Sequence, residues 1–237
     1  MARARTVSKD KVPFLPDERI EDEAKLLLDE WAEKQSDPIT VPVPIEDIIE
    51  LHLGLEFSIS DLKTELGHSD VLGAIWFGDR RIKVDESLDF NQYPRMRGRY
   101  FFTLAHEVGH WRLHRQHLAE DPNALRLFDK DGEPAFVCRS TEKPREEWQA
   151  DTFASLVLMP KQLVRDAWCD WRGTDDPVRI GDLPVCDFHG KIEADQNMAM
   201  ERFCKPMAER FEVSAQAMRI RLQKLGLMVE EIEPKLF

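Results

Sequence analysis

Apolar residues recur at helical spacing in several segments of the chain and predict a mainly helical protein. One amphipathic helix is expected over 17–31, and a second over 44–53, which a proline opens and a glycine closes. Two further segments, 97–115 and 147–158, carry apolar side chains on one face over several turns. We expect both of these to be helices with a buried face.

Short runs of strand-forming residues lie between the helices. Residues 55–59, 72–77 and 81–84 have the length and composition of strands. The Gly-Asp pair at 78–79 predicts that the last two form a hairpin. The segment 116–145 contains several Asp, Asn, Gly and Pro residues typical of turns, so we expect it to be mostly a connection between the two long helices.

Composition divides the chain into four parts. We predict a flexible arm at 1–16, a main domain at 17–167, a loop or insert at 168–200, and a small helical subdomain at 201–237. The last part resembles a helix–turn–helix, because two short helices with apolar periodicity are separated near residue 213. Although it is locally basic, we interpret it as a unit that seals the main domain rather than one that reads DNA.

Charge and hydropathy exclude several classes of protein. The 237 residues include 33 basic and 45 acidic side chains, and the net charge of −12 argues against binding to nucleic acids or anionic membranes. The charged start leads into no apolar signal segment. No apolar run approaches the roughly 20 residues that span a bilayer. We therefore expect a cytoplasmic protein with reduced cysteines.

The segment from His106 to His110 reads His-Glu-Val-Gly-His. Residues at i and i+4 share one face of a helix, so both imidazoles can point at one ion. Glu107 lies beside them, where it can accept a proton from water bound to that ion. The pattern predicts a Zn²⁺ site that carries its own catalytic base.

A third metal ligand is expected on the second long helix. Glu147 lies one turn before Asp151, so Glu147 can bind the zinc while Asp151 orients a ligand histidine by a hydrogen bond. His114 continues the i+4 series but lies a further turn, about 5–6 Å, along the axis. That favours a place on the helix surface or a hydrogen bond to a ligand. The longer metzincin motif fails, since residues 113 and 116 are Leu113 and Gln116.

A second metal site is a separate question. Cys186 and His189 have a Cys-x2-His spacing, and Cys169 and Cys204 flank them in the sequence. Structural zinc sites usually use two tight ligand pairs, and a second pair is missing. We interpret these cysteines as free thiols and leave the second metal open.

The two motifs together resemble those of the ImmA/IrrE family of zinc metallopeptidases. The resemblance rests on Phe102–His110, on Glu147–Pro160 and on the tail Ala208–Leu227. It implies an α+β fold, with a mainly helical zincin-like domain, a small three-stranded sheet and a small C-terminal helical subdomain. It also implies that the two motif histidines and Glu147 bind Zn²⁺, and that the protein cleaves a helix–turn–helix repressor. The chain departs from the family in its insert at 168–200 and in a longer loop before Glu147.

The leading hypothesis is a zinc-dependent endopeptidase that acts on a transcriptional repressor, with Glu107 as general base. The alternative is a toxin–antitoxin component, or a DNA- or partner-binding regulator, whose metal site is mainly structural. A glutamate beside the ligands and the negative charge count against the alternative. We also expect the hairpin around Ala74–Val84 to offer an edge that accepts substrate as an added strand.

Overall fold

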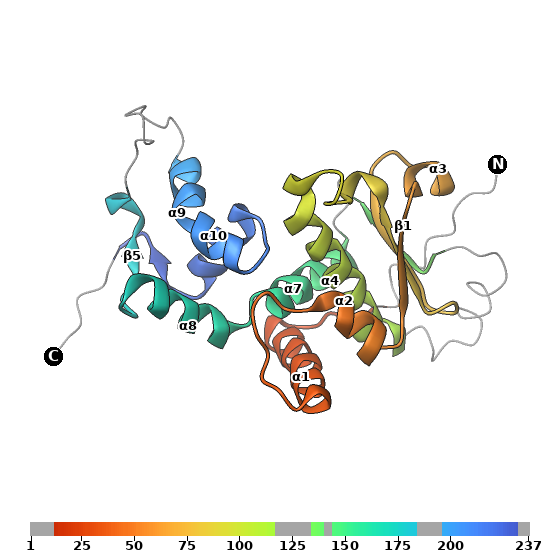
Figure 1. Cartoon of the computed structure of the whole chain (residues 1–237), viewed down its shortest axis with the longest axis horizontal. Coiled ribbons are helices and arrows are strands. Elements are labelled where there is room, and N and C mark those ends of the chain that lie inside the picture. The colour runs from red at the N-terminus through yellow and green to blue at the C-terminus, as the bar shows by residue number, and fades with distance from the viewer. Residues whose placement is uncertain (1–11, 117–133, 140–143, 184–195, 232–237) are drawn as a thin grey trace. The chain divides into compact units, whose positions relative to one another are not determined.

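The structure is a computed structural model that describes residues 12–116, 134–139, 144–183 and 196–231 (Figure 1). The α-helices are α1 (Asp17–Gln35), α2 (Ile45–Asp47), α3 (Leu62–Leu66), α4 (Arg97–Leu113), α7 (Arg145–Leu158), α8 (Lys161–Arg172), α9 (Gln196–Arg210) and α10 (Ala215–Lys224). The strands are β1 (Glu56–Ser60), β2 (Val71–Trp76), β3 (Arg81–Asp85), β4 (Phe136–Arg139), β5 (Val178–Arg179) and β6 (Met228–Val229). A π-helix, η1 (Ile48–His52), follows α2, and short 3₁₀ turns are η2 (Glu86–Leu88), η3 (Pro94–Met96) and η4 (Ile180–Asp182).

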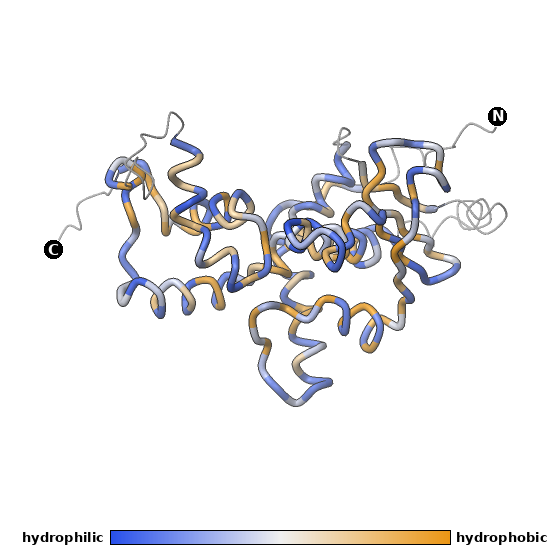
Figure 2. The backbone as a smooth tube through the Cα atoms, turned by 45° about the horizontal axis from the view of Figure 1, so that its top comes forward, coloured by the Kyte–Doolittle hydropathy of each residue, from blue (hydrophilic) through white to orange (hydrophobic). Residues whose placement is uncertain are grey.

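Contacts divide the chain into two compact units. The first comprises Met1–Ile39 and Val43–Leu158, and the second comprises Thr40–Pro42 and Met159–Phe237. Figure 2 shows hydrophobic and hydrophilic residues alternating along the helices, as expected when each helix buries one face. None of the helices in the described ranges combines the length and the hydropathy needed to cross a membrane.

The sheet of the first unit has four strands in the order β1-β3-β2-β4. Strands β2 and β3 form the predicted antiparallel hairpin, β1 pairs with β3 in parallel, and β4 pairs antiparallel with β2. The α+β fold is confirmed, with one strand more than the three implied by the resemblance. The extra strand, β4, lies in the segment 116–145, whose many turn residues predict mostly a connection.

The expectation that the β2–β3 hairpin offers a free edge is wrong. Strand β3 has a neighbour on each side, and so does β2, because β1 and β4 flank the hairpin. Within the described residues, the outer strands of this sheet are therefore β1 and β4. The sequence pattern predicts strands but not their lateral order, which depends on contacts distant in sequence.

Helix α4 connects the sheet to the other helices of the first unit. It packs against β2, β3 and β4 and also against α7 and α1. Arg112, near its C-terminal end, fixes α1 by ion pairs, with Nη1 2.8 Å from Glu30 Oε2 and Nη2 2.6 Å from Glu23 Oε1. A residue on α4 can therefore face either the sheet or α7, and both faces are buried.

The second unit contains α8, α9, α10 and the parallel pair β5–β6. Helices α9 and α10 pack on one another, and the Ser214 hydroxyl caps α10 by accepting a hydrogen bond from the Ala217 amide at 3.1 Å. The break between α9 and α10 falls near residue 213, where the helix–turn–helix pattern predicts it. Of the predicted insert at 168–200, residues 184–195 lie outside the described residues, and the predicted division into four parts remains a prediction.

Candidate metal centre

Small residues set the distance between α4, which carries the His-Glu-Val-Gly-His segment, and α7. A Cβ atom at Gly109 of α4 would lie 3.1 Å from Ala150 Cα and 3.3 Å from Phe153 Cβ, both on α7. Only glycine permits so close an approach of the two helices. Because Glu147 lies one turn before Ala150, this approach carries its carboxylate to the two motif histidines.

The structure brings His106, His110 and Glu147 together into one buried cluster. His106 Nε2 lies 3.1 Å from Glu147 Oε2, His110 Nε2 lies 3.2 Å from Glu147 Oε1, and the two Nε2 atoms are 3.0 Å apart. Ligands 2.0–2.1 Å from one tetrahedral ion would be about 3.3 Å apart. The three side chains are therefore spaced to hold a single metal ion.

A hydrogen bond on the far side of His106 sets its tautomer. Asp151 Oδ1 lies 2.9 Å from His106 Nδ1, and a carboxylate accepts, so Nδ1 carries the proton. The remaining lone pair is then on Nε2, which faces the cluster. Asp151 thus lies where it can orient the His106 ring, and its role beside a metal remains a prediction.

A chain of three hydrogen bonds sets the tautomer of His110. The Pro13 carbonyl can only accept, so Gln149 Nε2 donates to it at 2.9 Å and presents Oε1 to His114 Nε2 at 3.0 Å. His114 therefore donates from Nε2 and accepts at Nδ1 from His110 Nδ1, 2.9 Å away. Burial lowers the pKa of His114 to about 3, which keeps it neutral for this role. The lone pair of His110 is left on Nε2.

With both Nδ1 protons directed away from the cluster, the two Nε2 atoms and the Glu147 carboxylate converge, an arrangement that calls for a cation, either a proton shared with Glu147 or a metal ion. Burial alone would raise the pKa of Glu147, but His110 and His106 hold it well below its usual range. Burial lowers the pKa of His106, yet Cys138, Asp151 and Glu147 outweigh it and raise that pKa well above 6.5. A metal ion that binds here displaces the proton held by His106.

Glu107 is fully buried, and neither of its carboxylate oxygens has a hydrogen-bond partner among the described residues. Burial is the main cause that raises its pKa to about 8, and a cation held by the neighbouring side chains would lower this pKa again, because a nearby positive charge favours the carboxylate. Gly73 on β2 makes room for it, because a Cβ there would lie 2.7 Å from Glu107 Oε1 and 2.6 Å from Thr103 Cγ2. Gly73 was not among the site residues predicted from the sequence, although a glycine inside a strand often marks a close approach.

Strand β4 adds two residues that were likewise not predicted from the sequence. The Phe136 ring stacks on His110 with centroids 4.2 Å apart and planes at 11°. Cys138 contacts His106, and the possible ligand atoms of His106, Glu107 and Cys138 all lie within 4.8 Å of one another. The available signal was the short apolar run Ala135–Cys138, which turn-rich sequence surrounds.

The family model for peptidase M78, described as an IrrE N-terminal-like domain, matches residues 91–223. This is 133 of 237 residues, more than half of the chain. The chain belongs to the M78 peptidase family. The match includes both histidines, Glu107 and Glu147, and confirms the ImmA/IrrE resemblance.

Other comparisons add little about this M78 member. No curated protein matches the chain by sequence. One solved structure that it resembles is a Mycobacterium tuberculosis transcriptional regulator, with 13% identity, 86% of this chain and 51% of that chain covered, and a TM-score of 0.42. The chain thus spans about half the length of that protein, and the likeness is too low to support an argument.

The possible second metal site, which the sequence left open, involves four residues of this M78 member: Cys169, Cys186, His189 and Cys204. Cys186 and His189 lie outside the described residues. Cys169 is exposed and Cys204 is buried, and among the described residues neither belongs to a group of side chains that could hold an ion. Burial raises the pKa of the Cys204 thiol to about 12, as expected for an unreactive core cysteine.

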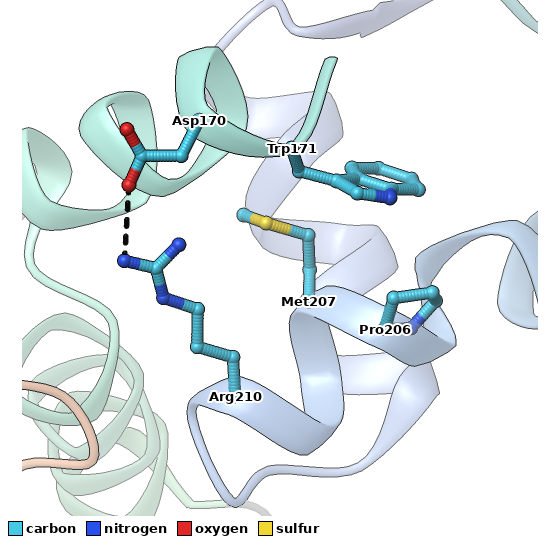
Figure 3. Close-up of a pocket in the computed structure, with 5 residues that line it drawn as sticks. All are labelled: Asp170, Trp171, Pro206, Met207 and Arg210. Atoms are coloured by element: carbon cyan, nitrogen blue, oxygen red, sulfur yellow. Dashed lines mark hydrogen bonds and ion pairs between the residues drawn. The ribbon is translucent and has the colours of Figure 1, made fainter. Parts of the chain in front are cut away.

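A small pocket lies in the second unit, away from these ligands in sequence. Figure 3 shows it between α8 and α9, with Trp171 and Met207 on its walls and an Arg210–Asp170 ion pair of 3.1 Å beside them. Its volume is about 240 Å³, below the range usual for small-molecule sites. We assign no role to this pocket.

Proposed function

We propose that this M78 family member is a zinc-dependent endopeptidase that hydrolyses a peptide bond in a helix–turn–helix transcriptional repressor, and thereby regulates gene expression. Two imidazoles and one carboxylate are the donor set of many catalytic zinc sites, which leave a fourth position for water or substrate. The M78 family match supports a metallopeptidase-type regulator. Zinc as the metal, endopeptidase activity and the repressor substrate are our proposal.

The observation that carries this proposal is the buried carboxylate of Glu107, which has no hydrogen-bond partner within the described part of the chain. An unpaired buried polar group costs about 1–3 kcal/mol or more, so a purely structural metal site gains nothing from it. A peptidase needs such a group to handle a proton. This argues against the alternative of a DNA- or partner-binding regulator with a structural metal.

The roles of the residues follow from their positions. His106, His110 and Glu147 would hold the zinc, which when bound polarises a peptide carbonyl and lowers the pKa of water. Glu107 accepts the proton of the attacking water and then delivers it to the leaving amine. Asp151 and His114 keep the two imidazoles in the metal-binding tautomer.

A cleavage assay with the repressor encoded nearest this gene tests the proposal. Zinc-loaded wild type, Glu107→Gln and the control Glu18→Gln, which alters an exposed carboxylate on α1, are each incubated with the repressor. Mass spectrometry should find one cut made by wild type and by Glu18→Gln but not by Glu107→Gln. An intact repressor in the presence of zinc-loaded wild type would reject it as the substrate.

A further inference from the structure

Residues 12–14, which precede α1 in the chain, lie against α7. The Pro13 carbonyl accepts a hydrogen bond of 2.9 Å from Gln149 Nε2. The Phe14 ring stacks on the Trp148 ring, with the planes at 7° and the centroids 6.1 Å apart. We call residues 12–14 the N-terminal strap. The strap is thus attached to α7 at two consecutive positions, one polar and the other aromatic.

The hydrogen bond from the strap is the first of a chain that ends at a proposed metal ligand. Gln149 Oε1 lies 3.0 Å from His114 Nε2, and His114 Nδ1 lies 2.9 Å from His110 Nδ1. All three of these side chains are fully buried. Because buried polar groups need a hydrogen-bond partner, the orientation of each group constrains the next group in the chain.

The side-chain amide of Gln149 can be placed in two ways, which give the chain opposite polarity. With Oε1 towards His114, that ring carries its proton on Nε2 and accepts at Nδ1 from His110, whose Nε2 keeps a lone pair. With the amide turned over, Gln149 donates to His114 Nε2, His114 donates from Nδ1, and the proton of His110 moves to its Nε2. In the second arrangement the Nε2 of His110 cannot bind a metal.

We propose that the N-terminal strap selects the first arrangement, with Gln149 as a positioning residue for His110. The inference rests on the proposed metal site. A carbonyl oxygen can only accept, so the Pro13 carbonyl takes the amide N–H and directs Oε1 at the neighbouring imidazole. The stack of Phe14 on Trp148 holds this carbonyl against α7. When the strap leaves α7, the amide is free to turn and the metal is held less tightly.

The zinc dissociation constant, measured by competition titration in two backgrounds, tests this proposal. The strap is displaced by combining Val12→Asp, which puts a charge at a buried position, with Phe14→Ala, and Phe14→Ala alone is the milder variant. Gln149→Glu is the second background, because a carboxylate can only accept from His114, whether or not the strap is in place. The control is Tyr93→Ala, which removes an exposed ring from the segment before α4.

With Gln149 present, both strap variants should raise the zinc dissociation constant, the double variant by about tenfold, because a group that orients a metal-binding histidine is lost. In the Gln149→Glu background the same strap changes should leave the constant nearly unchanged. Tyr93→Ala should leave it unchanged in both backgrounds. A strap that only stabilises the fold would not lose its effect in this way.

The other outcomes separate two failures. A dissociation constant that neither strap variant raises overturns the proposal. An equal rise in both backgrounds also overturns it, since this indicates a general loss of packing rather than a choice of amide orientation. Both of these results leave the three-ligand site intact. A wild-type protein that binds no zinc overturns the role of the strap together with the proposed metallopeptidase.

Discussion

Replacing Gly73 by alanine should displace Glu107, the proposed catalytic base, without removing the proposed metal ligands. The new Cβ would lie 2.6 Å from Thr103 Cγ2 and 2.7 Å from Glu107 Oε1, and both distances are too short for real Cβ contacts. The three atoms nearest to this Cβ belong to Thr103 and Glu107 rather than to a proposed metal ligand. The substitution therefore tests whether the position of Glu107, rather than the metal itself, limits turnover.

The size of the effect follows from the geometry. Ordinary contact begins at 3.4 Å, so Glu107 Oε1 must move by at least 3.4 − 2.7 = 0.7 Å. Misplacing a reacting group by about 1 Å can cost roughly 100-fold in rate. We expect Gly73→Ala to lower kcat/KM by about 10- to 100-fold, which corresponds to about 1.4–2.7 kcal/mol. Overpacking should also lower the free energy of unfolding by about 1–3 kcal/mol.

A double variant separates the two contacts. Thr103→Ser removes the Cγ2 methyl and so relieves one clash, but leaves the contact with Glu107. In the Gly73→Ala background it should restore stability, measured by urea denaturation, while cleavage of the repressor stays slow and zinc content stays at one ion. Gly181→Ala, whose Cβ would meet only ordinary contacts of 3.5 Å and beyond, is the control. Normal cleavage by Gly73→Ala would refute the reasoning.

Three further predictions concern parts around the centre. Gly109→Ala should force α7 away from α4, which should lower the unfolding free energy by about 1–3 kcal/mol and weaken zinc binding. Calorimetry that finds both the unfolding free energy and the zinc affinity unchanged would contradict this. His114→Leu leaves His110 Nδ1–H unpaired, so the zinc dissociation constant should rise about 10- to 100-fold in a competition titration. Asp85→Asn removes the ion pair to Lys63 and should lower the unfolding free energy by about 2 kcal/mol at pH 7. Burial raises the Asp85 pKa, but Lys63 and Ser87 bring it below 3.8, so urea midpoints of the two proteins should converge as pH falls below that value.

The local parts of the site are readable in the sequence. The two long helices were predicted within two residues at each end, because each carries an apolar stripe with a period that only a helix fits. The spacing of His106 and His110 fixes their common face, and the position of Glu147 one turn before Asp151 points to Glu147 as the proposed third ligand. All four of these side chains meet in the structure.

The remaining parts depend on contacts that local pattern does not record. Strand β4 is four residues long, turn-forming sequence surrounds it, and only its pairing with β2 makes it a strand. Phe136 and Cys138 were missed with it. His114 was expected either on the helix surface or in a hydrogen bond to a ligand. The structure shows the hydrogen bond to His110, and it depends on Gln149 of α7 and on the Pro13 carbonyl, both distant in sequence.

The central claim is that Glu107 acts as the base beside a metal that His106, His110 and Glu147 hold. The most direct test measures bound zinc and repressor cleavage on the same preparations of wild type, Glu107→Gln and Glu147→Gln. We predict one zinc and cleavage in wild type, one zinc without cleavage in Glu107→Gln, and loss of both in Glu147→Gln. Cleavage at the wild-type rate by Glu107→Gln, or tight zinc binding by Glu147→Gln, would contradict the account.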